Sequence, residues 1–240
     1  MKAMVLAAGR GLRLRPLTDT CPKPMLPLGG KPLLEHAIRL LAMHGFDQIA
    51  LNLHHLPEVI RSYFGDGSPW RVRLTYSLET ELLGTAGSVR RMSAFFDQPF
   101  LVYYGDNLTN MDLAEFWAAH QREGELASMG LHAEDDPCRS GIVRLDGSSR
   151  VAQFIEKPKP DQVFPGFQIN CGIYALEPAI FDWIPGEPPC DFGADVFPRL
   201  LAGGRPIYGH RMRGQLLPSD TPERYAAAQA RVADGRFTPA

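Results

Sequence analysis

The chain has 240 residues, of which 45% are hydrophobic and 22% are charged, a balance typical of an ordinary globular protein. Its 25 Lys and Arg residues and 27 Asp and Glu residues give a formal net charge of -2, which excludes a general polyanion binder such as a DNA-coating protein. We therefore expect no nucleic-acid partner, and any phosphate recognition must be local. The four cysteines lie far apart without a C-x-x-C pair, which argues against a zinc site and against a secreted disulfide framework.

The start of the chain carries no clear targeting signal. Residues 1–8 are apolar, but Gly9 and Arg10 follow too early for the core of a signal peptide. No later apolar run approaches the roughly 18 residues that a membrane span requires. We therefore expect a cytoplasmic protein without a membrane partner.

Short apolar runs alternate with helical patterns through the first half of the chain. Strands are predicted at residues 3–7, 48–53, 72–76 and 100–104, and helices at 32–44, 84–95 and 113–122. This alternation predicts an α/β fold whose largely parallel sheet is covered by helices on both faces.

The pattern becomes richer in strands after residue 125. Strands are predicted at 126–131, 141–145, 151–155 and 168–175, followed by a loop at 184–193 and helices at 194–201 and 222–232. We expect these strands to extend a mixed sheet within one domain that spans residues 1–240.

A glycine-rich loop follows the first predicted strand, with the sequence L-A-A-G-R-G-L-R-L-R-P-L-T at residues 6–18. Ligands gather at the carboxyl ends of strands in α/β sheets, and glycines there let the backbone approach a phosphate. Arg10, Arg13 and Arg15 lie beside Gly9 and Gly11, and the guanidinium fork suits phosphate oxygens. The loop thus indicates a triphosphate site, and the alternative of a surface turn with solvated arginines stays open at this point. The chain has neither the third glycine of a dinucleotide fingerprint nor a P-loop motif, so a Rossmann dehydrogenase and a P-loop NTPase are not supported.

Further motifs occur in a fixed order along the chain. They are P-K-P-M-L-P at 22–27, G-K-P-L-L-E-H at 30–36, L-G-T-A-G at 83–87, Y-G-D-N at 104–107, F-I-E-K-P at 154–158, N-C-G-I-Y at 170–174 and T-P-E-R-Y at 221–225. With the glycine-rich loop, this series resembles the sugar-phosphate nucleotidyltransferases, the family of the mannose- and heptose-1-phosphate guanylyltransferases and the glucose-1-phosphate thymidylyl- and uridylyltransferases.

The resemblance implies a three-layer, Rossmann-like nucleotidyltransferase fold with a mixed, mainly parallel sheet. It implies a nucleotide-binding half at residues 1–125 and a sugar-binding half at 126–240 that includes the C-terminal helix. The implied reaction is the magnesium-dependent transfer of a nucleotidyl group from a nucleoside triphosphate to a sugar 1-phosphate, which gives an NDP-sugar and pyrophosphate. The implied partners are these two substrates, and the sequence leaves homo-oligomerisation open.

The resemblance implies three catalytic residues. Arg13 and Lys23 would hold the triphosphate and the departing pyrophosphate, whose developing charge fixed cations should stabilise. Asp106 would be a Mg²⁺ ligand at the end of a buried strand, and Mg²⁺ needs only one or two protein carboxylates. Taken alone, an aspartate after a strand is more often a helix cap or a turn residue.

Other positions are implied to bind the substrates. Lys157 would hold the sugar phosphate, Glu156 and Asn170 would bond sugar hydroxyls, and the segment with Gly84 and Gly87 would pass near the base and ribose. Without the family motifs, Glu156 and Lys157 would be read as a solvated surface pair. The remaining implied substrate-binding positions are Leu6, Ala8, Gly9, Gly11, Thr85 and Asn107.

Two glutamates before L-G-T-A-G bear on the choice of base. A carboxylate at Glu79 or Glu81 could accept two protons from the edge of guanine, whereas uracil or thymine offers one. This difference favours GTP, with UTP and dTTP as alternatives. The competing interpretation is that both are solvated loop carboxylates.

Two positions depart from the family pattern. Leu12 stands where a small hydroxyl residue is usual, and Pro218 stands where the family carries a second metal-binding aspartate. Asp220 lies two residues further on and would face the same side of an extended segment, about 7 Å away. We expect Asp220, or a water that it holds, to complete the metal site. The alternative is that the site binds magnesium weakly. Weak binding would be compatible with a function of another class, a catalytically weakened regulatory subunit that binds nucleotide sugars.

Two short patterns are set aside. His54 and His55 lack the i, i+4 spacing of a zinc helix and have no nearby cysteine, so we expect them at the surface or at a cleft edge. The triplet D-F-G at residues 191–193 also occurs in kinases, but the chain has no H-R-D catalytic loop.

Overall fold

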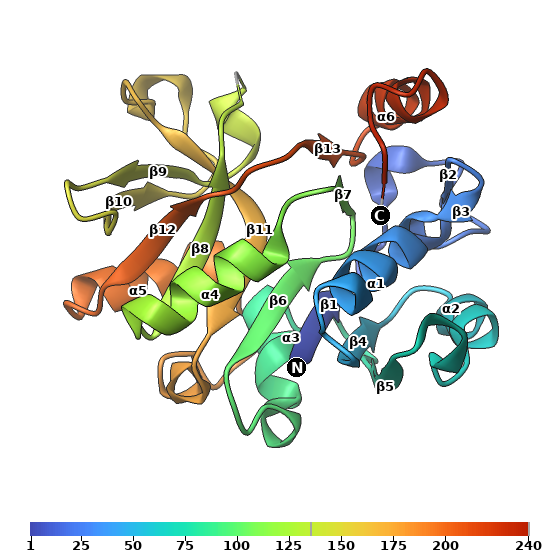
Figure 1. Ribbon diagram of the computed structural model, residues 1–240, viewed down its shortest axis with the longest axis horizontal. Coiled ribbons are helices and arrows are strands. Elements are labelled where there is room, and N and C mark those ends of the chain that lie inside the picture. Colours follow the sequence, from blue (N-terminus) through green and yellow to red (C-terminus); the bar gives the residue numbers. More distant parts are fainter. Residues whose placement is uncertain (135, 240) are drawn as a thin grey trace. The chain divides into compact units, whose positions relative to one another are not determined.

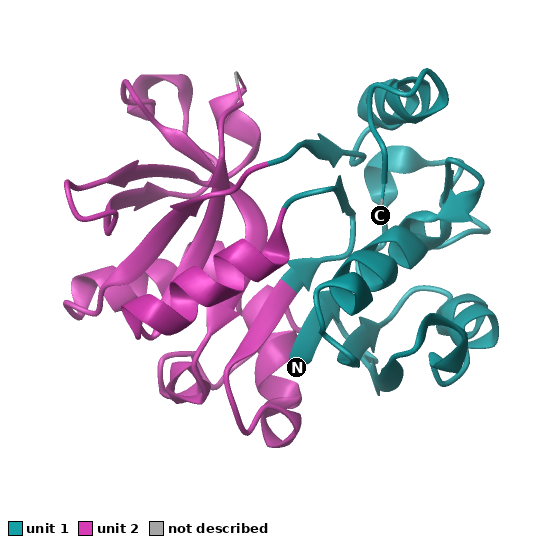
Figure 2. Cartoon of the chain, viewed as in Figure 1, with its two compact units in different colours: residues 1–82, 103–111, 214–240 teal, residues 83–102, 112–213 magenta. Residues whose placement is uncertain are grey.

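The computed structural model describes residues 1–134 and 136–239, and Figure 1 labels its helices and strands. Contacts divide the chain into two compact units, each assembled from separate stretches of sequence (Figure 2). Unit 1 contains residues 1–82, 103–111 and 214–240, and unit 2 contains residues 83–102 and 112–213. The C-terminal helix therefore groups with the N-terminal residues. The expectation of one domain with halves that meet at residue 125 stays a prediction.

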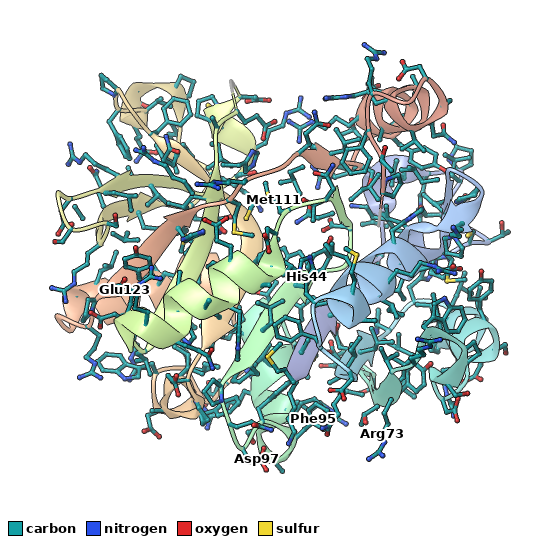
Figure 3. All side chains as sticks on the ribbon, in the orientation of Figure 1. His44, Arg73, Phe95, Asp97, Met111 and Glu123 are labelled. Carbon is teal, nitrogen blue, oxygen red and sulfur yellow. The ribbon has the colours of Figure 1, made fainter. Side chains whose placement is uncertain are left out.

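Three parallel strands form the centre of unit 1. They are β1 (Lys2–Leu6), β4 (Gln48–Leu53) and β5 (Arg73–Leu78). Residues 3–5 and 49–53 are buried without a break, which is the pattern of parallel strands that are covered on both faces. β5 begins at the exposed Arg73, which is labelled in Figure 3. In register, Leu6 lies opposite Asn52 and Asn52 lies opposite Ser77, so the carboxyl ends of all three strands meet along one edge.

The other elements of unit 1 are helices and two small antiparallel pairs. The helices are α1 (Leu33–Met43), α2 (Pro57–Phe64) and α6 (Pro222–Ala233). The pairs are β2 (Pro27–Leu28) with β3 (Lys31–Pro32), and β7 (Asn107–Thr109) with β13 (Leu216–Pro218). α6 begins as capping rules require, because the Thr221 hydroxyl accepts a hydrogen bond from the Arg224 N–H and Pro222 occupies the first turn. On the inner side of α6, Tyr225 and Ala228 join a buried cluster with Leu108 and Leu217 of β7 and β13.

Unit 2 contains a mixed set of strands. They are β8 (Ala127–His132), β9 (Ile142–Leu145), β10 (Val151–Ile155), β11 (Gln168–Leu176) and β12 (Ile207–Arg211). β11 pairs antiparallel with β8 and β9, β10 pairs antiparallel with β9, and β12 pairs parallel with β8. β6 (Phe100–Tyr104) crosses the boundary of the two units at residue 103. With the helices, these pairings confirm the predicted α/β class and its mixed sheet.

The helices of unit 2 are α3 (Thr85–Arg91), α4 (Leu113–Glu123) and α5 (Phe197–Ala202). A π-type turn at Phe192–Val196 precedes α5, so this helix is shorter than the one predicted at 194–201. Phe192 and Phe197 both pack on Tyr174 of β11, with ring centroids 5.3 and 4.9 Å away. This aromatic cluster holds the 192–197 segment against the strand that carries Asn170. Over residues 1–134 and 136–239, the helices are too short or too polar to cross a membrane.

Candidate active site

The glycine-rich loop begins where β1 ends, as predicted. Gly11 has a φ of 63°, and a side chain there would meet Thr18 at 2.9 Å, so the position needs glycine. The Thr18 hydroxyl donates to the Gly11 carbonyl at 2.9 Å and closes the loop on itself. A side chain at Gly9 would meet nothing within 4 Å, so the backbone there is open to a ligand. The predicted positions Leu6, Ala8, Gly9 and Gly11 thus follow one another at the carboxyl end of β1.

Each of the three loop arginines has a different partner. The Arg13 guanidinium contacts the Asp220 carboxylate at 2.7 Å, and Arg15 contacts Asp19 at 3.1 Å. Arg10 donates through Nε to His54 Nε2 at 3.4 Å. Arg13 is therefore the loop arginine that lies beside a predicted metal carboxylate.

Lys23 and Asp106 form an ion pair, with 2.7 Å between Nζ and Oδ2. Only 10% of the lysine side chain is exposed, against 42% of the aspartate side chain. Asp106 is positioned by Gly105, whose N–H donates to the Leu6 carbonyl at 3.0 Å. A side chain at Gly105 would lie 2.9 Å from that carbonyl oxygen, so only glycine lets the chain pass this close to the end of β1. The pair consequently sits beside the start of the glycine-rich loop.

β13 brings the segment after Pro218 to the same place. Pro218 lies opposite Asn107, another predicted substrate-binding position, and the Ser219 hydroxyl donates to the Asp106 carbonyl at 3.0 Å. Strand geometry ends at Pro218 and Asp220 lies in a bend, so the expected extended geometry does not continue to residue 220. Asp220 nevertheless reaches the glycine-rich loop through its contact with Arg13.

The Asp220 carboxylate is surrounded by positive charge. Burial raises the pKa of this carboxyl, but Arg13, Arg224 and Lys23 together lower it more, so its pKa lies below the usual range. The two ion pairs with contacts of 2.7 Å bring together four charged side chains of unit 1, which we call the carboxylate–cation cluster. Its members are Arg13, Lys23, Asp106 and Asp220.

The cluster offers the donor set that magnesium prefers. Asp106 and Asp220 supply hard carboxylate oxygens, and each carboxylate already has a cation within 2.7 Å, which indicates that this pair of anions requires positive compensation. No group of three or more His, Cys, Asp and Glu side chains suited to a metal occurs in the described part of the chain. A site with one or two carboxylates and additional phosphate and water ligands is the usual arrangement for Mg²⁺.

Glu79 is buried, whereas Glu81 is exposed. Only 3% of Glu79 is accessible, so the interpretation of Glu79 as a solvated loop carboxylate is wrong. Its Oε1 accepts a hydrogen bond from Asn52 Nδ2 at 2.9 Å, and its backbone carbonyl accepts one from His54 Nδ1 at 3.0 Å. Asn52 and His54 were not among the predicted site residues, because neither carries a motif that marks it.

In unit 2, the L-G-T-A-G segment forms the start of α3. Gly84 has a φ of 76°, and a side chain there would lie 2.4 Å from the backbone of Cys190, so the position accepts only glycine. The Gly87 N–H donates to the Cys190 carbonyl at 3.0 Å. The Thr85 hydroxyl donates to Asp191 at 2.9 Å and accepts from the Phe192 N–H at 2.9 Å. These bonds fix the start of α3 to residues 190–192.

The predicted sugar-binding residues also lie in unit 2. Glu156 sits between Gly141 and Gly193, where added side chains would come within 2.9 and 2.4 Å of its Oε2. Its neighbour Lys157 is 69% exposed and 3.9 Å from the Glu156 carboxylate. Asn170 is engaged at both ends of its amide, since Oδ1 accepts from the Gly172 N–H and Nδ2 donates to the Tyr174 hydroxyl. The two glycines thus leave Glu156 the space that a carboxylate at this position needs.

The environment of Glu156 predicts a pH-dependent effect on stability. Burial raises the pKa of its carboxyl, and Asp191 adds to the increase while Lys157 opposes it. A carboxyl whose pKa is higher in the folded protein than in the unfolded chain stabilises the fold at pH values below the unfolded pKa of about 4.3. This stabilisation is lost as the pH rises through the pKa of the folded protein. Glu156→Gln should therefore gain stability relative to the wild type between pH 4 and pH 7. Urea unfolding at both pH values measures this gain, with the exposed Glu187→Gln as control. A difference between wild type and E156Q that stays constant with pH would contradict the prediction.

Comparison with known proteins identifies the family. A family model described as "Nucleotidyl transferase" matches residues 2–220. The UTP–glucose-1-phosphate uridylyltransferase of Synechocystis sp. is 39% identical over 226 residues, which cover 88% of this chain and 58% of the relative. The mannose-1-phosphate guanylyltransferase of Mycobacterium tuberculosis is 34% identical over 235 residues, which cover 97% of this chain and 65% of the relative. The chain thus spans less than two thirds of the length of these relatives.

Solved structures agree on the fold. UDP-glucose pyrophosphorylase complexed with UDP-glucose superposes with a TM-score of 0.85 at 20% identity, covering 98% of this chain and 99% of that one. HddC from Yersinia pseudotuberculosis complexed with GMP-PN gives a TM-score of 0.80 at 24% identity, and the match covers 96% of this chain and 98% of HddC. The Rossmann-like nucleotidyltransferase fold expected from the sequence is therefore confirmed. With a family model matched over residues 2–220 and these relatives at more than 30% identity, the chain belongs to the sugar-phosphate nucleotidyltransferase family.

Proposed function

We propose that this protein transfers a nucleotidyl group from a nucleoside triphosphate to a sugar 1-phosphate, with magnesium as cofactor and pyrophosphate as the second product. The observation that carries the proposal is the carboxylate–cation cluster beside the glycine-rich loop. Two cations and two carboxylates make contacts of 2.7 Å beside the loop that follows β1, and ligands of α/β sheets gather at such strand ends. Family membership supports the same reaction.

The reaction needs positioning more than covalent chemistry. An oxygen of the sugar 1-phosphate attacks the α-phosphorus in line, a new P–O bond forms, and the bond between the α-phosphorus and the bridging oxygen breaks, so that pyrophosphate leaves with the electron pair. Arg13 and Lys23 would hold the leaving pyrophosphate and offset the charge that develops on it. A bound magnesium ion would supply further charge neutralisation at the phosphates, with Asp106 and Asp220 as its protein ligands.

GTP is the favoured nucleotide. A buried carboxylate at Glu79 is suited to accept the two protons at the edge of guanine, and burial strengthens such bonds. The relatives include a guanylyltransferase and a uridylyltransferase, so UTP is the main competitor and dTTP the next.

A substrate panel tests the proposed function. Purified protein is incubated with magnesium, each of GTP, UTP and dTTP, and each of several hexose and heptose 1-phosphates, and pyrophosphate release is followed. We expect turnover with GTP and at least one sugar phosphate. Turnover with UTP alone would overturn the GTP assignment and leave the reaction class intact. A thermal shift with nucleotide but no pyrophosphate from any combination would favour the catalytically weakened regulatory subunit.

Asp220→Ala tests the second metal ligand. Removing this carboxylate should raise the magnesium concentration for half-maximal activity roughly tenfold, within the range seen when groups that support a metal site are lost. The measurement is a magnesium titration of pyrophosphate release. Asp19→Ala is the matched control, because Asp19 also pairs with a loop arginine, but with Arg15 and not with a member of the cluster. An unchanged magnesium requirement would remove Asp220 from the metal site.

A further inference from the structure

The end of β4 and the two histidines that follow it hold the glycine-rich loop at three points. Asn52 Oδ1 accepts a hydrogen bond from the Ala7 N–H at 2.8 Å. His54 Nε2 accepts from Arg10, and His55 Nε2 donates to the Thr18 carbonyl at 2.9 Å. The three contacts reach the start, the middle and the end of the loop.

Asn52 has the most constrained position of the three. It lies at the carboxyl end of the middle strand of the parallel set, opposite Leu6 of β1 and Ser77 of β5, and only 3% of it is exposed. Its side chain bridges the residue after β1 to Glu79 after β5. The asparagine thus connects the ends of both neighbouring strands.

The orientation of the Asn52 amide follows from its partners. A backbone N–H can only donate, so the side-chain oxygen must face Ala7. The amide nitrogen then faces Glu79 Oε1 at 2.9 Å and must donate to it. Glu79 therefore fixes which end of the amide points at the loop, and loss of its acceptor would free the amide to turn. A buried amide with both ends engaged is a rigid support.

We propose that Asn52 positions the glycine-rich loop for binding of the triphosphate. Asn52 holds the Ala7 N–H at the start of the loop, and Glu79 keeps the oxygen of the Asn52 amide turned toward Ala7. This inference rests on the proposed function of the loop but not on the choice of base. In this role Asn52 acts through the loop backbone and not by contact with substrate. Its effect is to hold the backbone of residues 7–11 in the conformation that presents N–H groups to phosphate.

Asn52→Asp and Glu79→Gln together test the inference. In Asn52→Asp alone, the new carboxylate can still accept from Ala7 but faces the Glu79 carboxylate. Once the pH is high enough for both carboxylates to be ionised, they repel each other, the contact is lost and the loop should loosen. Adding Glu79→Gln reverses the direction of the hydrogen bond between residues 52 and 79. The introduced glutamine amide donates to the new carboxylate, and the Ala7 N–H keeps its acceptor. Glu79→Gln alone also keeps the bond, because the carbonyl oxygen of the introduced amide accepts from Asn52.

Binding of inorganic tripolyphosphate by calorimetry is the readout, since it reports on the loop without base, sugar or turnover. We expect N52D to bind tripolyphosphate roughly tenfold more weakly than the wild type, which is the effect of about one hydrogen bond. N52D/E79Q and E79Q should stay within about threefold of the wild type on the same scale. Asn110→Asp is the matched control, because Asn110 also accepts a backbone N–H, from Gln215, but outside the loop. Asn52→Ala, which loses both bonds to Ala7 and Glu79, is measured alongside because it adds no charge near the loop.

The outcomes separate the inference from the proposed function. Unchanged tripolyphosphate affinity in N52D or N52A would overturn the positioning role, as would a folded N52D that E79Q fails to rescue. Rescue of N52D by E79Q together with weaker tripolyphosphate binding in N52A would support it, because N52A removes the hydrogen bond to Ala7 without placing a second carboxylate beside Glu79. Absence of pyrophosphate release from every substrate combination would overturn the proposed reaction, whereas the tripolyphosphate series still decides the role of Asn52.

Discussion

Asp106→Asn is expected to lower kcat/KM for pyrophosphate release roughly 10³-fold, which corresponds to about 4 kcal/mol of transition-state stabilisation. Asparagine has nearly the same shape, so the change removes charge without opening space. Two consequences follow from the geometry. The proposed magnesium site would lose one of its two carboxylates, and the buried Lys23 loses the partner that lies 2.7 Å away.

The measurement is steady-state pyrophosphate release under saturating magnesium, with Asp19→Asn as the control. Asp19 pairs with Arg15 in the same loop and is half-exposed, so its variant should stay within about twofold of the wild type. Binding of GTP in the absence of metal should persist in D106N, which separates a lost metal ligand from an unfolded protein. A drop of less than tenfold would show that Asp106 is not a metal ligand in the reaction.

Elements with continuous apolar runs were predictable from the sequence. The strands predicted at 48–53, 100–104 and 151–155 are β4, β6 and β10 residue for residue. Burial on both faces gives β4 and β6 mainly apolar runs, which a local sequence pattern detects, whereas β10 is buried at Val151 and partly exposed beyond it. The helix predicted at 222–232 is also confirmed as α6, since Thr221 and Pro222 mark its start in the sequence.

Elements defined by partners elsewhere in the chain were missed. β12, with the sequence I-Y-G-H-R, has no alternating pattern and exists through its parallel pairing with β8. α2 was missed because it is short and buries only Ile60 and Phe64. The helix predicted at 84–95 ends at Arg91, and a 3₁₀ turn at Ser93–Phe95 follows it, which helical periodicity alone does not distinguish.

The candidate site was predictable in its residues but not in its pairings. The motifs pointed to Arg13, Lys23 and Asp106, yet Lys23 and Asp106 are 83 residues apart and meet only because Gly105 passes against the end of β1. Contact between Arg13 and Asp220 likewise depends on β13 pairing with β7. His54 and His55 were expected at the surface or at a cleft edge, and their hydrogen bonds to the loop could not be foreseen, because a histidine pair without metal spacing carries no local signal.

Lys23→Met is expected to reduce kcat/KM roughly 10²- to 10³-fold, a loss typical of one preorganised group that stabilises developing charge. Lys23 lies against the glycine-rich loop, since a side chain added at Gly11 would come within 3.0 Å of its Cβ. It therefore sits between the loop and Asp106, where one ammonium can serve the leaving pyrophosphate. Lys23→Arg should not restore activity, because a larger planar group has no room in a position that is 8% exposed.

Metal binding distinguishes Lys23→Met from Asp106→Asn. In the protein without nucleotide, the Lys23 ammonium holds the Asp106 carboxylate at 2.7 Å and competes with any divalent cation for it. Removing the ammonium should leave the affinity for Mn²⁺, measured by electron paramagnetic resonance without nucleotide, equal to or higher than that of the wild type, while turnover falls. Asp106→Asn should lose both Mn²⁺ affinity and turnover. If Lys23→Met instead weakened Mn²⁺ binding in step with turnover, the lysine would be acting by holding Asp106 in place for the metal, and its assignment to the leaving pyrophosphate would be wrong.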